Sequence, residues 1–146
     1  MIAANQAGSP NYAAAAQLTQ AVTVNNAPTL LDIDASAASL AAGTKYDAAT
    51  DGMMVLRYLL GYTGTAITAN ATGSSATRDS AQIAAHLQSV QAVLDVNGDG
   101  NTMATADGVL IVRYMLGLRG ASLVANIPLG TLSATDIENR ISRLMP

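Results

Sequence analysis

The hydrophobic positions of this chain form the same pattern twice. Residues 53–60 and 109–116 are continuously apolar except for one arginine in each run, and a glycine follows each run directly. An apolar run of this length, closed by Gly61 or Gly117, predicts a helix of two to three turns. Because almost every face of such a helix is apolar, we expect both helices to be mostly buried.

Further along each half, apolar residues recur every three to four positions, which predicts a second, amphipathic helix. Asp79 or Ser80 is a suitable N-cap for the first of these helices. Ser133 caps the second, with Asp136 at the position of a capping-box residue. We expect coil between the paired helices. The predicted buried stripes are Ile83, Leu87 and Val90 in the first half and Ile137, Ile141 and Leu144 in the second.

The two halves are an internal repeat. Asp51 corresponds to Asp107 at a spacing of 56 (107 − 51), whereas Leu31 corresponds to Leu94 at a spacing of 63 (94 − 31). The difference of seven (63 − 56) is an insertion in the first loop, around residues 37–44. We therefore predict a mainly α domain over residues 29–146. It consists of two duplicated, EF-hand-like loop-helix units, each with an extra amphipathic helix: repeat one (29–91) and repeat two (92–146).

The first 28 residues differ from the repeats and are predicted to be a strand and a linker. Residues 18–24 alternate with period two and favour a short N-terminal β segment, for which the sequence identifies no partner strand. Residues 8–12 together with Val22-Thr23-Val24 resemble the last strands of bacterial immunoglobulin-like repeats. This resemblance implies that the chain is the C-terminal piece of a longer modular protein.

Acidic residues are concentrated just before the two apolar runs. Seven of the ten Asp and Glu residues lie in these two windows. Clustered carboxylates repel one another unless a cation neutralises them, so the clustering favours metal binding. The seven are Asp32, Asp34, Asp47 and Asp51 in the first half, and Asp95, Asp99 and Asp107 in the second.

The segment from Asp95 to Asp107 has the spacing of a calcium-binding loop. Ca²⁺ takes roughly six to eight oxygen ligands, and the D-x-N-x-D-G pattern is that of the EF-hand loop. An EF-hand closes with Glu at its twelfth residue, whereas Asp107 is the thirteenth, so the loop must bring Asp107 closer. The predicted ligands are Asp95, Asn97, Asp99, the backbone carbonyl of Asn101 and Asp107, with Gly100 at the sharp turn.

The first loop follows the same order with fewer charges. Ser36 replaces an Asp, so we expect weaker calcium binding here than in the second loop. The alternative is a degenerate loop that keeps the fold without metal. Asp47 is either a water-mediated ligand or a solvated residue. The predicted ligands are Asp32, Asp34, Ser36, the backbone carbonyl of Lys45 and Asp51.

Composition excludes several classes of function. Half of the residues are apolar but only 3% are aromatic, and cysteine is absent, so the core is thin and its added staple is not a disulfide. The net charge is −3 without a Lys/Arg cluster, which argues against nucleic acid, and the longest apolar stretch is too short to span a membrane. No signal peptide is visible, as is also expected of a chain that begins inside a longer protein. His86, the one histidine, lacks a visible nucleophile or acid partner, so we expect a half-buried helix residue and no enzyme.

A calcium loop followed by a helix that ends Arg-Tyr-Leu/Met-Leu-Gly, present twice, resembles a dockerin. The resemblance covers residues 31–64 and 94–120, and it is closer still to a bacterial dockerin-like variety with Thr-Asp-Gly before the helix, here Thr50-Asp51-Gly52. Dockerins are extracellular modules that dock onto cohesins. The resemblance therefore implies two Ca²⁺ sites, a secreted or cell-surface location, and a cohesin-like partner or neighbouring domains of the parent chain. The insertion, the longer loop and the extra helices depart from dockerins, and an extra helix would cover the surface that a cohesin uses.

The dockerin resemblance also implies which residues face a partner. They lie just before each closing aspartate and on the helix that follows: Ala49, Thr50 and Arg57, and Thr105, Ala106 and Arg113. The alternative for the two arginines is to neutralise nearby loop carboxylates.

Three functions remain open: a calcium-stabilised structural module, a docking module, and a calcium sensor with a Met-rich groove. Met53, Met54 and Met115 hint at the sensor, but Met at helical spacing is more typical of a core. At millimolar calcium and micromolar affinity, occupancy adds about 4 kcal/mol per site. That rivals the roughly 5–15 kcal/mol of a whole domain, which favours structure or docking over sensing.

Overall fold

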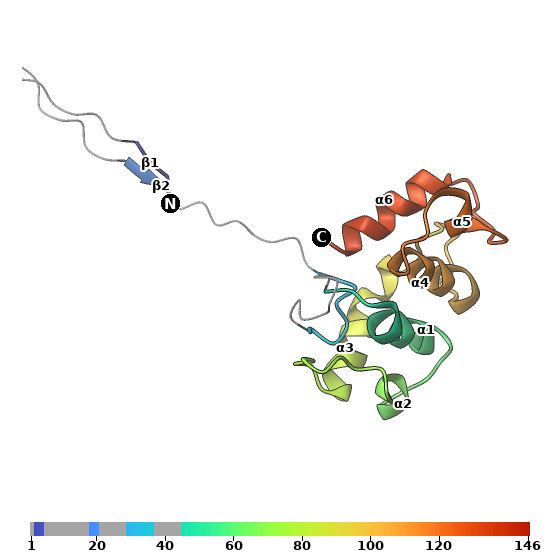
Figure 1. Ribbon diagram of the computed structural model, residues 1–146, viewed down its shortest axis with the longest axis horizontal. Coiled ribbons are helices and arrows are strands. Elements are labelled where there is room, and N and C mark those ends of the chain that lie inside the picture. The colour runs from blue at the N-terminus through green and yellow to red at the C-terminus, as the bar shows by residue number, and fades with distance from the viewer. Residues whose placement is uncertain (1, 5–17, 21–28, 37–44) are drawn as a thin grey trace, which may run out of the picture.

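The computed structural model describes residues 2–4, 18–20, 29–36 and 45–146, and this part of the chain is mainly helical (Figure 1). The prediction of a mainly α protein is confirmed. Strand β1 (Ile2–Ala4) pairs antiparallel with β2 (Leu18–Gln20), with Ala3 opposite Thr19. The rest of the predicted strand, the segment at residues 8–12 and the insertion at 37–44 lie outside the described residues.

The helical elements follow one another in the same order in both halves. In the first half, a π-helical turn η1 (Ala48–Gly52) runs into α1 (Met53–Leu59), and α2 (Thr65–Thr68), α3 (Ser80–Val90) and the 3₁₀ turn η2 (Gln91–Val93) follow. In the second half, η3 (Ala104–Gly108) runs into α4 (Val109–Met115), and α5 (Gly120–Val124) and α6 (Ala134–Leu144) follow. The short helices α2 and α5 occupy the segments where coil was expected.

The helix ends follow the local signals in the sequence. Gly61 and Gly117 adopt φ values of 86° and 87°, the left-handed conformation that ends a helix. Asp79 caps α3 in a capping box with Gln82, and Ser133 caps α6 in a capping box with Asp136. The predicted caps and terminating glycines are therefore confirmed.

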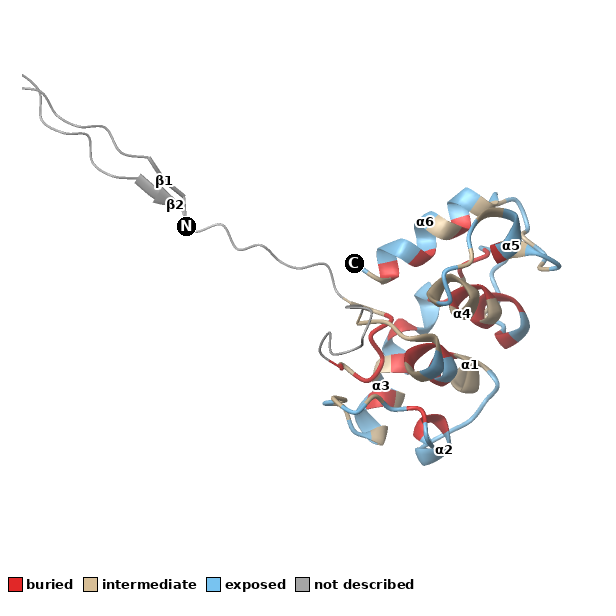
Figure 2. Ribbon diagram, viewed as in Figure 1, coloured by how far each residue is buried: buried red, intermediate tan, exposed pale blue. Residues whose placement is uncertain are grey.

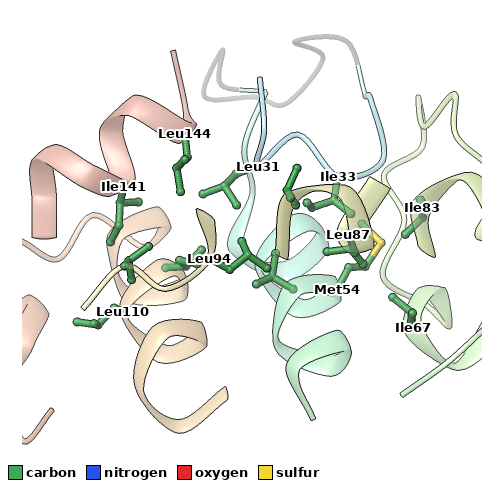
Figure 3. Packing of buried hydrophobic residues seen from close by; sticks show 14 of the residues in the cluster. Leu31, Ile33, Met54, Ile67, Ile83, Leu87, Leu94, Leu110, Ile141 and Leu144 are labelled. Atoms are coloured by element: carbon green, nitrogen blue, oxygen red, sulfur yellow. The ribbon is translucent and has the colours of Figure 1, made fainter. Parts of the chain in front are cut away.

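One hydrophobic cluster runs through both halves (Figure 3). Both predicted amphipathic stripes are buried, and the loop residues Leu31, Ile33 and Leu94 add fully buried side chains. The expectation for α1 and α4 was too strong, because most of their residues are only half-buried (Figure 2). Leu60 and Leu116, directly after them, are 57% and 64% exposed.

Helices α1 and α4 pack antiparallel, with each N-terminal end against the C-terminal half of the other. A Cβ at Gly108 would lie 2.9 Å from Cδ1 of Leu56, and a Cβ at Gly52 would lie 3.1 Å from Sδ of Met115. Both glycines have ordinary helical φ values, so this close approach, and not a special backbone conformation, accounts for glycine here.

We expect Gly108→Val to lower the free energy of unfolding by about 2 kcal/mol, because its side chain would overpack the contact with α1. A urea titration measures this change. Thr105→Val is the matched control, since Thr105 is exposed on the same turn and its replacement should have little effect. Equal stability of the Gly108 variant and the parent chain would contradict the packing described for this helix pair.

Candidate metal centre

Three buried carboxylates converge in the first loop. Asp32 and Asp34 lie in the segment 29–36, and Asp51 lies in the π-helical turn η1. One carboxylate oxygen from each lies within 4.8 Å of the others. Asp34 and Asp51 are fully buried and Asp32 is 8% exposed. In the described part of the chain, this is where three acidic side chains meet closely enough to hold one metal ion.

Backbone amides satisfy two of these carboxylates. Oδ1 of Asp51 accepts from the amide of Ile33 at 2.7 Å, and its Oδ2 accepts from the amide of Asp47 at 3.0 Å. The two oxygens of Asp34 accept from the amides of Ser36 (2.9 Å) and Gly73 (2.6 Å). Among the described residues, Oδ1 of Asp32 is buried without a hydrogen-bond partner. A buried anionic oxygen without a donor is destabilising, and a cation would satisfy it.

The surroundings of Asp51 and Asp32 favour the neutral forms of these two carboxylates when no metal is bound. Burial raises the pKa of Asp51 to about 6, and the charges of Asp34 and Asp32 add to this, while the amides of Asp47 and Ile33 oppose it. Burial and the charge of Asp34 also raise the pKa of Asp32, whereas the charge of Arg78 lowers it. Three charged carboxylates in this position therefore need a counter-ion.

The raised pKa of Asp51 predicts how stability depends on pH in the presence of a chelator. Between about pH 4 and pH 6 the folded chain holds a proton on Asp51 that the unfolded chain has lost, so stability falls as pH rises through this interval. A pKa of about 6 against 3.8 amounts to about 2 kcal/mol lost over this interval. Urea titrations at several pH values measure it, and Asp51→Asn should flatten the dependence. A stability that rises from pH 4 to pH 7 would contradict this environment.

Residues between α2 and α3 close over the first loop, which the sequence did not reveal. Besides the bond from Gly73, the amides of Thr77 and Arg78 donate to the carbonyl of Asp34 at 3.0 and 3.1 Å. Nη1 of Arg78 donates to the carbonyls of Asp32 and Ile33. No spacing rule links position 34 to position 73, so tertiary structure alone brings them together.

The π-helical turns explain why each loop closes one residue late. The amide of Gly108 donates to the carbonyl of Met103 at 3.1 Å, and that of Gly52 donates to the carbonyl of Asp47 at 3.0 Å. Each bond spans five residues, which accommodates one residue more than an α-helical turn. The turn brings the carboxylate of Asp107 close to the backbone of its loop, where its Oδ1 accepts from the amides of Val96 and Asn97.

In the second loop, local backbone amides already occupy the candidate ligands. The two oxygens of Asp95 accept from Gly98 and Gly100 (2.8 and 3.0 Å), and Oδ1 of Asp99 accepts from Asn101 at 2.8 Å. Asp99 and Asn101 are exposed, and the three acids of this loop, all described, do not converge as those of the first loop do. The structure thus favours the first loop, the reverse of the ranking drawn from the sequence.

The two loops nevertheless follow a similar path. Ala35 and Gly98, at corresponding positions, both have positive φ values, 52° and 71°. Gly100 has a φ of 85°, as expected of the residue at the sharp turn. In the second loop, Asn97 is fully buried, and its Nδ2 donates to the carbonyl of Pro128 at 3.2 Å, so a later segment also contacts this loop.

The remaining residues of the first loop have mixed roles. Ser36 is buried, and its amide binds Asp34. The charge of Lys45 lowers the pKa of Asp32, so the ammonium group of Lys45 acts on this carboxylate. Asp47 is not merely solvated, because its side chain caps η1 by accepting from the amides of Ala49 and Thr50. Tyr46 lies beside Asp32 and Asp51, since burial and their two charges raise its pKa to about 12.

The predicted partner-facing residues divide into two groups. Ala49 and Thr105 are exposed and Thr50 is half-buried, whereas Ala106 is only 7% exposed because its turn packs against α1. Ala106 therefore does not present a surface to a partner, which corrects the expectation for this residue.

The two arginines act inside the chain. Nη1 of Arg57 donates to the carbonyls of Ile67 and Ala69 at 3.0 and 2.7 Å, which caps the C-terminal end of α2. Nη1 of Arg113 makes the equivalent bonds to Leu123 and Ala125 at the end of α5. The sequence suggested a partner contact or neutralisation of a loop for these arginines, and neither of these roles includes the observed bonds. It explains why these short helices form without an apolar pattern of their own.

Packing accounts for His86, for Met54 and for Met115, which is partly buried against the core. His86 is half-buried on α3, with Nε2 2.9 Å from the carbonyl of Leu30. Met54 is fully buried in the core, and Met53 is 37% exposed.

No protein-family model, no curated protein and no solved structure matches the chain. Within the described residues, no helix combines the length and apolar character needed to cross a membrane.

Proposed function

We propose that this chain is a calcium-binding, dockerin-like module that calcium stabilises. It acts as a structural or protein-docking domain of a larger extracellular protein. The observation that carries the proposal is the buried triad of Asp32, Asp34 and Asp51, with one oxygen of Asp32 left without a donor.

The chemistry of the triad suits calcium. Its ligand atoms are hard carboxylate oxygens, with neither His nor Cys in the cluster, and such donors favour Ca²⁺ or Mg²⁺ over softer metals. Ca²⁺ tolerates irregular geometry, whereas Mg²⁺ demands a near-ideal octahedron and gives up its water reluctantly. A loop that brings together residues 32, 34 and 51 therefore fits calcium better.

Calorimetric titration of the chelator-treated chain tests calcium binding directly. We expect saturable binding of Ca²⁺, with much weaker binding of Mg²⁺ at the same concentration. Asp34→Asn should abolish the tighter phase, and Asp136→Asn is a matched control, because Asp136 lies on α6 as a capping-box residue. Absence of any heat of binding by the parent chain would refute the proposal.

A docking role is the second part of the proposal, and it rests on the resemblance to dockerins. The candidate contacts that remain accessible are Ala49, Thr50 and Thr105. A pull-down from the secreted proteins of the source organism should recover a cohesin-like partner only when calcium is present. Ala49→Arg with Thr105→Arg should prevent it, whereas the exposed Ser142→Arg should not. If no such partner is recovered, the structural role stands alone.

A further inference from the structure

Arg78 places a fixed positive charge beside the acidic triad. The residue lies directly before Asp79, the N-cap of α3, and its guanidinium group is bound to the carbonyls of Asp32 and Ile33. Its own amide is bound to the carbonyl of Asp34 at 3.1 Å. Backbone and side chain are thus both attached to the first loop, and the charge has a defined position.

This charge alters the electrostatics of the candidate site. Three carboxylates and one guanidinium group carry a net charge of −2 (−3 + 1) when all are ionised. The charge of Arg78 lowers the pKa of Asp32 more than the charge of Lys45 does, so Arg78 acts more strongly than Lys45 on this carboxylate. In the second half, Leu132 precedes the N-cap Ser133, so the arginine comes from a different position. There Nη1 of Arg140, on α6, donates to the carbonyl of Asp95 at 3.4 Å.

We propose that Arg78 sets the charge selectivity of the first loop, matching it to divalent rather than trivalent cations. The proposal rests on calcium binding by this loop. A fixed positive charge repels a bound cation in proportion to the charge of that cation. The repulsion therefore costs a trivalent ion half as much again in binding free energy as it costs a divalent ion. Removal of the guanidinium group should therefore strengthen binding of Tb³⁺ more than binding of Ca²⁺.

Terbium luminescence excited through tyrosine measures both affinities in the full chain. Tyr46 lies beside Asp32 and Asp51, so Tb³⁺ in the first loop should be sensitised, and Tyr46→Phe should remove that signal. Displacement of Tb³⁺ by Ca²⁺ then gives the ratio of the two dissociation constants. A loss of loop geometry weakens the binding of both ions alike, whereas a loss of charge changes the ratio of their dissociation constants.

Arg78→Gln should tighten Ca²⁺ binding about fivefold and Tb³⁺ binding about tenfold, raising the preference for Tb³⁺ about twofold. Arg78→Lys keeps the charge without the forked hydrogen bonds, and its ratio should equal that of the parent chain. Lys45→Gln should raise the ratio by less than Arg78→Gln.

An unchanged or lowered ratio in a folded Arg78→Gln chain would overturn the selectivity proposal and leave calcium binding intact. If Arg78→Gln does not fold, as judged by circular dichroism, the Arg78→Lys chain decides: a ratio that differs from that of the parent chain would show that the charge of Arg78 does not set the selectivity. Failure of the parent chain to bind either ion would instead refute the proposed function itself.

Discussion

Chelation of calcium should lower the melting temperature of this chain by roughly 15 °C. At calcium concentrations about a thousandfold above the dissociation constant, one site contributes about 4 kcal/mol, and 1 kcal/mol shifts the midpoint of a domain of this size by about 4 °C. The stabilisation is large because the metal-free state keeps three like charges buried in the first loop. Thermal melts followed by circular dichroism, with calcium and with chelator, measure it.

The two loops should contribute unequally to this shift. Asp34→Asn and Asp99→Asn each neutralise one carboxylate, the first in the buried triad and the second in the exposed loop. The triad contains the unpartnered oxygen of Asp32, which a metal would satisfy, whereas a metal at Asp99 would only replace existing hydrogen bonds. We expect Asp34→Asn to remove most of the calcium-induced shift and Asp99→Asn the smaller part. The reverse order would restore the ranking drawn from the sequence.

Replacement of Asp107 by alanine should destabilise the chain by about 4 kcal/mol even when calcium is absent. Its carboxylate accepts from the amides of Val96, Asn97 and Met103 at 2.9, 3.2 and 2.8 Å, and the side chain is fully buried. Each buried amide left without an acceptor costs roughly 1–3 kcal/mol, and some of that is recovered where water enters. This aspartate therefore holds its loop together whether or not it also binds metal.

Urea titration in chelator measures the effect of Asp107→Ala. The matched control is Asp99→Ala, which removes an exposed carboxylate from the same loop and should change the free energy of unfolding little. If both variants lose the same small amount, the hydrogen bonds of Asp107 are not what organises the loop.

Local signals in the sequence predicted most of the helices. The capping residues Asp79 and Ser133, the terminating glycines Gly61 and Gly117 and the two amphipathic stripes act over three or four neighbouring residues, so their effect is visible in the sequence. Helices α2 and α5 are too short to carry a hydrophobic period, and each is capped by an arginine ten to twelve residues earlier in the chain. That interaction has no local signature.

The ranking of the two loops by metal binding stays a prediction, because the spacing of ligands in the sequence does not reveal their burial. The second loop matches the EF-hand pattern better, yet Asp95 is half-buried, Asp99 is exposed, and both are bound to amides of the loop itself. The first loop departs from the pattern, yet Gly73 and Arg78, about forty residues further along, close over it. The π-helical turn that draws Asp51 or Asp107 inward was likewise seen only as a loop one residue too long.

The most direct test of a calcium site at the triad is the melting temperature of Asp32→Asn under two conditions. In chelator, we expect this variant to melt above the parent chain, because it replaces an unpartnered buried charge with an amide that can donate to the neighbouring carboxylates. In calcium, it should melt below the parent chain, because a charged ligand has been lost. A variant that melts below the parent chain under both conditions, or above it under both, would contradict a calcium site built on this triad.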